Sequence, residues 1–211
     1  ATPAEIVLLG TDPAYSEVTV NLPGGGEVGP TPPGQFQLQV TPAGGTSTIV
    51  QAFCIDSLNP IGPGTTYQVV LQTAADAPEL ANPAHAEAGW LMQEADALIA
   101  ASPNPSLEAG AIQTAIWVIL GQADPSTPTS DATLNARAQQ IRFGKRAREV
   151  GEKKVAYGHL PGFAGIGLPG RAGDFLQCGF RNAGEERGLP QQILDRLGHR
   201  ILLSVPRCVY Q

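Results

Sequence analysis

The first 136 residues of this 211-residue chain contain no lysine and no arginine. They hold 13 of the 19 acidic residues, for a charge of −13, whereas the rest of the chain holds all 13 bases and six acids, for +7, which gives the net charge of −6. A segment this acidic repels the phosphates of a nucleic acid, so we expect no nucleic-acid partner for it. The abrupt change in charge at Arg137 indicates two parts with different origins or partners.

Long apolar runs are also absent. No stretch approaches the ~18 consecutive apolar residues that a membrane helix requires, so the sequence predicts no membrane span. Aromatic residues make up only 6% of the chain, whereas it has 25 glycines and 19 prolines. This composition is typical of a turn-rich β domain rather than a helical bundle.

Cysteine is scarce, with three residues in the chain. Cys178 and Cys208 both lie in the basic part and could pair, which would leave Cys54 alone in the acidic part. A cysteine left over in an exported protein is buried, paired between chains or chemically active.

The hydrophobic pattern predicts strands first and helices afterwards. Apolar and polar residues alternate, or form short apolar runs between Gly/Pro turns, over residues 6–9, 18–22, 35–40, 48–55 and 65–71. Helical spacing follows over residues 83–101, 106–120 and onward from about 130, with Asn82 and Ser106 as N-caps and Gly121 as a stop. We therefore predict an α+β fold, namely a β-sandwich or barrel with an inserted helical subdomain.

The domain boundary is predicted near residue 140. Residues 1–140 form the main domain, and residues 141–211 form a basic, Gly/Arg-rich segment of uncertain origin with one amphipathic helix near 189–203. We hypothesise that a frame change or fusion made this segment foreign to the domain, because the shift in composition is so abrupt. The gene sequence around that codon tests the hypothesis, since it fails if no alternative frame restores an Ala-rich helix.

Two short segments carry candidate chemistry. The first, Phe53-Cys54-Ile55-Asp56, ends a predicted strand, and the second, Ala111-Ile112-Gln113-Thr114-Ala115-Ile116-Trp117, lies on the second predicted helix. A thiol fixed beside a glutamine carboxamide can attack it, expel ammonia and leave a thioester. Such a bond needs side chains held in register and shielded from water, and apolar side chains are available for that shielding: Phe53, Ile112, Ile116 and Trp117.

These segments resemble the thioester domains of bacterial surface adhesins, also called Cys-Gln thioester-forming surface proteins. The family pattern is an aromatic residue and Cys on an early strand, followed later by an apolar residue, Gln, two variable residues, an apolar residue and Trp. The context is also similar, with a Gly-x-x-Tyr strand (Gly64 to Tyr67) after Cys54 and a helix bearing Trp90 before Gln113. The resemblance covers roughly residues 15–140.

The resemblance implies a secreted or cell-surface adhesin whose signal peptide has been removed. Its thioester, formed by Cys54 and Gln113, captures a lysine amine of a host or matrix protein, with Tyr67 and Trp90 among the shielding or binding residues. Each molecule reacts once, so the protein is not an enzyme, and no cofactor or metal is required. The absence of lysine from residues 1–136 suits a domain that must not consume its own thioester.

Simpler interpretations remain open at this point. An inert core Cys54 would make the chain an exported structural or matrix protein that binds only non-covalently, and ordinary hydrogen bonds would then satisfy Gln113. His85 with Cys54 could indicate a cysteine hydrolase, although no protease signature surrounds Cys54. The cysteines and histidines show no paired spacing typical of metal ligands.

Overall fold

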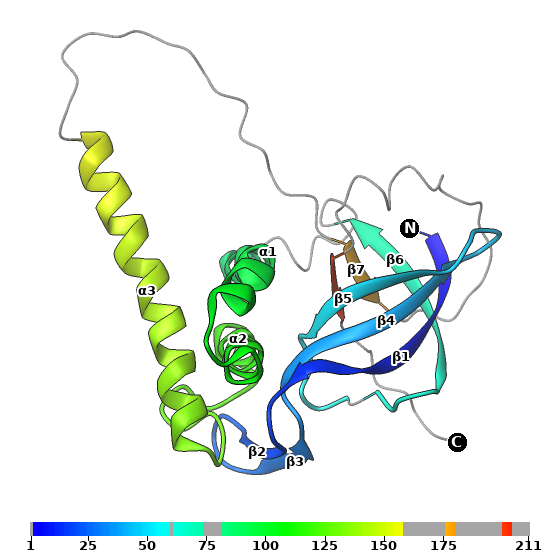
Figure 1. Ribbon diagram of the computed structural model, residues 1–211, viewed down its shortest axis with the longest axis horizontal. Coiled ribbons are helices and arrows are strands. Elements are labelled where there is room, and N and C mark those ends of the chain that lie inside the picture. Colours follow the sequence, from blue (N-terminus) through cyan, green and yellow to red (C-terminus); the bar gives the residue numbers. More distant parts are fainter. Residues whose placement is uncertain (1, 60, 74–81, 158–175, 180–199, 204–211) are drawn as a thin grey trace, which may run out of the picture.

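The computed structural model describes residues 2–59, 61–73, 82–157, 176–179 and 200–203. Six strands in this part of the chain form a closed barrel (Figure 1), in the order β1 (Thr2–Ala14), β4 (Gly34–Pro42), β5 (Thr48–Cys54), β8 (Arg200–Leu203), β7 (Leu176–Gly179) and β6 (Thr66–Thr73). The strands β6, β1, β4 and β5 pair antiparallel, whereas β8 pairs parallel with both β5 and β7.

Alternating side chains fill the barrel, as the strand pattern predicts. In β1, Ile6 and Leu8 are buried and lie opposite Val40 and Leu38 of β4. Val50 and further apolar residues from β5 and β6 complete this cluster. Because inward and outward positions alternate along each strand, one apolar face is sufficient to build the core.

A two-stranded ribbon, β2 (Val18–Asn21) and β3 (Glu27–Thr31), stands beside the barrel. A glycine-rich turn joins the strands, with the Gly26 carbonyl accepting from the Leu22 N–H at 3.0 Å. In Figure 1 the ribbon lies at the foot of the helices, where it meets the chain segment between the second and third helices.

The described part of the chain has three helices, α1 (Pro83–Ala101), α2 (Pro105–Ile119) and α3 (Ala132–Tyr157), and α2 lies against the barrel and against both other helices. The predicted start of α1 is confirmed, because Asn82 caps it by accepting from the His85 N–H at 3.0 Å. The predicted cap of α2 was wrong. Asn104, not Ser106, accepts from the Leu107 N–H, because Pro105 fits the first helical position and begins the helix earlier.

Helix α2 is the centre of the helical layer. Every residue from Glu108 to Val118 is buried, because α2 packs against α1, α3 and the barrel strands β1, β4 and β5. Gly110 permits the close approach, since a Cβ there would lie 2.7 Å from the Cβ of Tyr15 and 3.3 Å from the Pro33 carbonyl. A glutamine in the middle of this helix therefore has to find its hydrogen bonds inside the protein.

The α+β class is thus confirmed: strands β1 to β6 precede the helices, and β7 and β8 follow them. Helix α3 continues through residue 157, across the predicted boundary at residue 140. Of the helix predicted over 189–203, residues 200–203 form strand β8, and the remainder lies outside the described residues, as does Cys208. None of the helices in the described part is long and apolar enough to cross a membrane.

Candidate functional site

Cys54 and Gln113 meet where the barrel touches the helical layer. Cys54 is the last residue of β5, and Gln113 lies in the middle of α2 with no solvent exposure. The two residues are 59 positions apart in the sequence, so the packing of α2 against β5 brings them together.

The Gln113 carboxamide pairs with the backbone of Cys54 through two hydrogen bonds. The Cys54 N–H donates to Gln113 Oε1 at 2.8 Å, and Gln113 Nε2 donates to the Cys54 carbonyl at 2.7 Å. This pairing fixes the plane and orientation of the amide beside the residue that bears the thiol. The N–H donor also polarises the amide carbonyl, which is the arrangement that stabilises an oxyanion during acyl transfer.

The thiol lies in packed, water-poor surroundings. Its sulfur donates to the Asp56 carbonyl at 3.1 Å. Burial raises the pKa of the Cys54 thiol to about 11, and the nearby Asp56 backbone and Trp117 side chain act in the opposite direction and lower this pKa only partly. The thiol is therefore protonated at neutral pH. Cys54 as a whole residue is partly exposed.

A small apolar cluster covers one side of Cys54. It consists of Val20 from β2, Trp117 and Val118 from α2, and Ala123, and Cys54 packs against it. A backbone hydrogen bond joins β2 to the segment after α2, since the Asp124 N–H donates to the Asn21 carbonyl at 2.8 Å. We call Val20, Trp117, Val118 and Ala123 the cover.

The segment that begins at Asp124 forms a hydrogen-bonded turn. The Asp124 carboxylate accepts hydrogen bonds from the Ser126 N–H at 2.8 Å and from the Thr127 N–H at 3.0 Å. The Ser126 hydroxyl also donates to it, and this bond is the largest of the effects that lower the pKa of Asp124. Asn21 Nδ2 donates to the Thr127 carbonyl at 2.6 Å. Asp124 and Thr127, which follow Ala123 in the chain, are thus hydrogen-bonded to Asn21 of β2.

Three of the predicted shielding residues lie on the other side of the pair. Phe53, Ile112 and Ile116 are buried in the larger helical cluster that α1, α2 and α3 form. Gln113 itself has no solvent exposure, and within the described residues both hydrogen bonds of its carboxamide run to the Cys54 backbone. A dry site of this kind strengthens electrostatic interactions and slows hydrolysis of an acyl intermediate.

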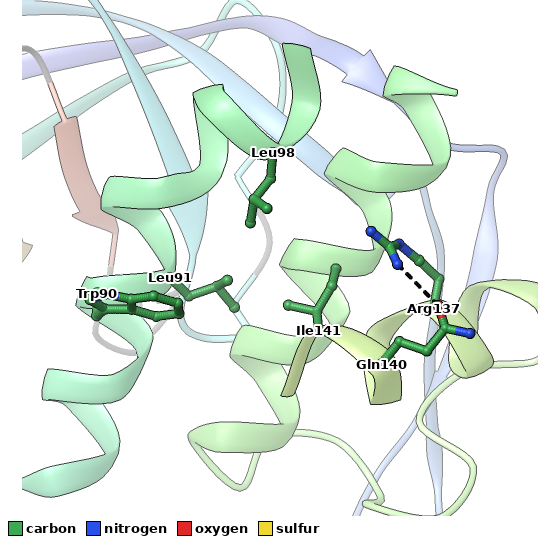
Figure 2. A pocket seen from close by; sticks show the side chains of 6 residues that line it. All are labelled: Trp90, Leu91, Leu98, Arg137, Gln140 and Ile141. Atoms are coloured by element: carbon green, nitrogen blue, oxygen red, sulfur yellow. Dashed lines mark hydrogen bonds between the residues drawn. The ribbon is translucent and has the colours of Figure 1, made fainter. Parts of the chain in front are cut away.

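Tyr67 and Trp90 lie elsewhere. The Tyr67 hydroxyl accepts from the Gly62 N–H at 2.8 Å, and its ring packs against the barrel cluster. Trp90 packs at the edge of the helical cluster and lines a pocket of about 80 Å³ between α1 and α3 (Figure 2). This pocket shares no lining residue with the Cys54–Gln113 pair. The structure therefore brings six of the eight predicted site residues together.

Three members of the cover, Val20, Val118 and Ala123, were not among the predicted site residues. Nothing in an isolated apolar residue shows which cluster it joins. The burial of Glu108 was also not predicted. This residue lies on α2, where Arg137 of α3 donates to both carboxylate oxygens at 2.7 and 2.8 Å. The feature of the sequence that could have indicated a buried ion pair is Arg137, the first basic residue in the chain.

His85 occupies a structural position. Its backbone N–H is bound by the side chain of Asn82 at the start of α1, and its ring Nδ1 lies 2.7 Å from Asn82 Nδ2. The hydrogen bonds of Cys54 in the described part of the chain run to Gln113 and Asp56, not to a histidine. This arrangement does not activate a cysteine hydrolase.

Comparison with known proteins adds no further assignment. No family model matches the chain, no curated protein is significantly similar to it, and no solved structure matches it.

Proposed function

We propose that this chain carries a thioester domain, in which Cys54 and Gln113 condense and then capture an amine covalently. The observation that carries the proposal is the double hydrogen bond between the Gln113 carboxamide and the Cys54 backbone, inside an apolar enclosure. The barrel with its helical layer would then be a variant of the thioester-domain fold that the Cys and Gln motifs resemble.

The first step forms the thioester. The Cys54 sulfur attacks Cδ of Gln113, the C–N bond breaks, and the thiol proton leaves with the amide nitrogen as ammonia. The Cys54 N–H at 2.8 Å from Oε1 stabilises the oxyanion of the tetrahedral intermediate. A thiol with a pKa near 11 attacks slowly at neutral pH, but a reaction that occurs once per molecule does not need a high rate.

The second step captures the partner. An unprotonated amine attacks the same carbon, the C–S bond breaks, and a proton from the amine ends on the Cys54 sulfur. The product is an amide between the amine and Gln113, with the thiol regenerated. The partner we propose is a lysine-bearing host or matrix protein, and the place of action is the exterior of a bacterial cell.

The alternative is a structural or matrix protein with an inert Cys54. The same hydrogen bonds favour it, because they satisfy the buried Gln113 amide without any covalent bond. The raised pKa of the thiol favours it as well, since a protonated thiol is a poor nucleophile. The two functions differ in whether an amine becomes attached to Gln113.

The test is incubation with a labelled amine followed by peptide mapping. We expect the label on Gln113 in the wild-type protein and none in Cys54→Ala. That variant is a matched control, because Gln113 hydrogen-bonds to the backbone of residue 54 and keeps both partners. Equal labelling of both proteins, or none in either, would rule out a thioester as the route of capture.

A further inference from the structure

The indole N–H of Trp117 is a buried polar group without a structural hydrogen bond in the described part of the chain. Its nitrogen is inaccessible to solvent. Most buried N–H groups in folded proteins are paired, because leaving one unpaired costs free energy. An N–H of this kind is available to an acceptor that forms in another chemical state of the protein.

The geometry identifies the acceptor. Trp117 follows Gln113 by four positions on α2, so both side chains project from the same face of the helix. Cys54 packs directly against the cover to which Trp117 belongs. The ring that covers the sulfur thus also carries the unpaired donor.

The chemistry of sulfur agrees with this placement. The thiol is a weak acceptor and already uses its hydrogen on the Asp56 carbonyl at 3.1 Å, whereas a thiolate is a strong acceptor. The Trp117 side chain acts to lower the pKa of Cys54, against the larger effect of burial. The indole N–H therefore stabilises the negative form of the sulfur rather than the neutral one.

We propose that the Trp117 indole N–H donates a hydrogen bond to the Cys54 sulfur as it leaves Gln113 during amine capture. The inference rests on the proposed thioester. As the new C–N bond forms and the C–S bond breaks, the electron pair passes to sulfur, and the indole N–H meets the developing charge until a proton from the amine arrives. Trp117 is then a hydrogen-bond donor in the reaction and not merely a shield.

The two possible roles of Trp117, shield and hydrogen-bond donor, predict opposite changes in the rate of amine capture when Trp117 is replaced by Phe. If the ring only shields, Trp117→Phe leaves a gap and admits the amine more readily, so capture becomes faster. If the N–H donates to sulfur, the same variant retains an aromatic cover but loses the donor, so capture becomes slower. Val118→Ala is the matched control, because it loosens the same cover and retains the N–H.

The experiment measures methylamine capture by intact mass for the wild type, Trp117→Phe and Val118→Ala. We expect Trp117→Phe to be about three- to tenfold slower than wild type, which corresponds to half to one pKa unit at the sulfur. Val118→Ala should equal or exceed the wild-type rate. A rate for Trp117→Phe that equals or exceeds the wild-type rate would overturn the proposal.

A second replacement guards against a misfolded variant. Incorporation of 3-benzothienylalanine at position 117 preserves the shape of the ring system and removes only the N–H. The alkylation rate of the free Cys54 thiol at fixed pH, mapped by peptide mass, gives a readout that does not need a thioester. It should fall by about the same factor, and an unchanged rate would contradict the donor role. Absence of a thioester in the wild type would instead refute the proposed function while this alkylation comparison still decides the role of Trp117.

Discussion

A single side chain, Gln113, joins the two halves of the site. It is fully buried on α2, and its carboxamide satisfies the last N–H and C=O of β5 instead of solvent. Sheet ends ordinarily leave such groups for water or another strand. The glutamine is therefore both a structural bridge between helix and barrel and the acyl donor of the proposed reaction.

This bridge predicts unequal costs for removing the two partners. Gln113→Ala leaves a cavity and two unpaired backbone groups, whereas Cys54→Ala leaves the backbone pairing intact. We expect Gln113→Ala to be less stable than Cys54→Ala by about 2–4 kcal/mol in denaturant unfolding. Both variants lack any thioester, so the comparison is independent of it. Equal stabilities would show that the backbone pairing contributes nothing.

The thiol form of Cys54 should titrate unusually late. Burial raises its pKa from 9.0 to about 11, so its alkylation rate should keep rising about tenfold per pH unit beyond pH 9. Because the folded pKa exceeds the unfolded one, the contribution of this group to stability is complete below about pH 9 and is lost as the pH rises towards 11. Iodoacetamide kinetics mapped to the Cys54 peptide check the first point, with urea-unfolded protein as the control. A plateau near pH 9 in the folded protein would contradict it.

At the scale of elements, the position of α2 depends on a glycine. A Cβ at Gly110 would lie 2.7 Å from the Tyr15 Cβ, too close to be accommodated without movement. Helix propensity alone favours Ala over Gly by about 1 kcal/mol. At Gly110 overpacking outweighs this gain, whereas Gly144 on α3 has open space around it.

Gly110→Ala should therefore destabilise the protein by about 1–3 kcal/mol, because it pushes α2 away from the segments that carry Tyr15 and Pro33. Gly144→Ala should be neutral or stabilising by up to about 1 kcal/mol. Thermal and denaturant unfolding of the two variants provides the measurement. A stabilised Gly110→Ala protein would show that α2 is not packed as tightly as described.

The sequence predicts those elements that local rules determine and fails for those that depend on packing. Local rules were sufficient for α1, because Asn82 and Pro83 mark its start, and for the alternating β4. They were insufficient for β3 (Glu27–Thr31), whose residues are mostly exposed and follow no buried pattern. The Cys54–Gln113 approach could be expected from the resemblance, but not the pairing through the Cys54 backbone, which depends on how α2 docks.

At the scale of the whole molecule, the chain consists of an acidic part, residues 1–136, and a basic part, residues 137–211. The acidic part carries the candidate site, and its −13 charge attracts cationic surfaces and repels anionic ones. Within the described residues Arg137 pairs with the buried Glu108 and ties the first base of the chain to α2. Partner selection by the proposed thioester should therefore depend on the charge around the target lysine.

Salt should reveal this dependence. Between about 0.05 and 0.5 M salt, capture of a lysine peptide flanked by arginines should slow severalfold, and capture of one flanked by glutamates should not. Methylamine, whose reactive form is neutral, is the matched control and should change little. Second-order rate constants from intact mass provide the data, and identical salt dependence for both peptides would exclude electrostatic selection.

The intact mass of the purified, denatured protein shows whether the bond between Cys54 and Gln113 forms. If the thioester forms, the mass lies one ammonia below that of the sequence, and methylamine then raises it by one methylamine and frees the Cys54 thiol. A mass equal to that of the sequence, with a free Cys54 thiol and no uptake of methylamine, would contradict the thioester and leave the inert structural alternative.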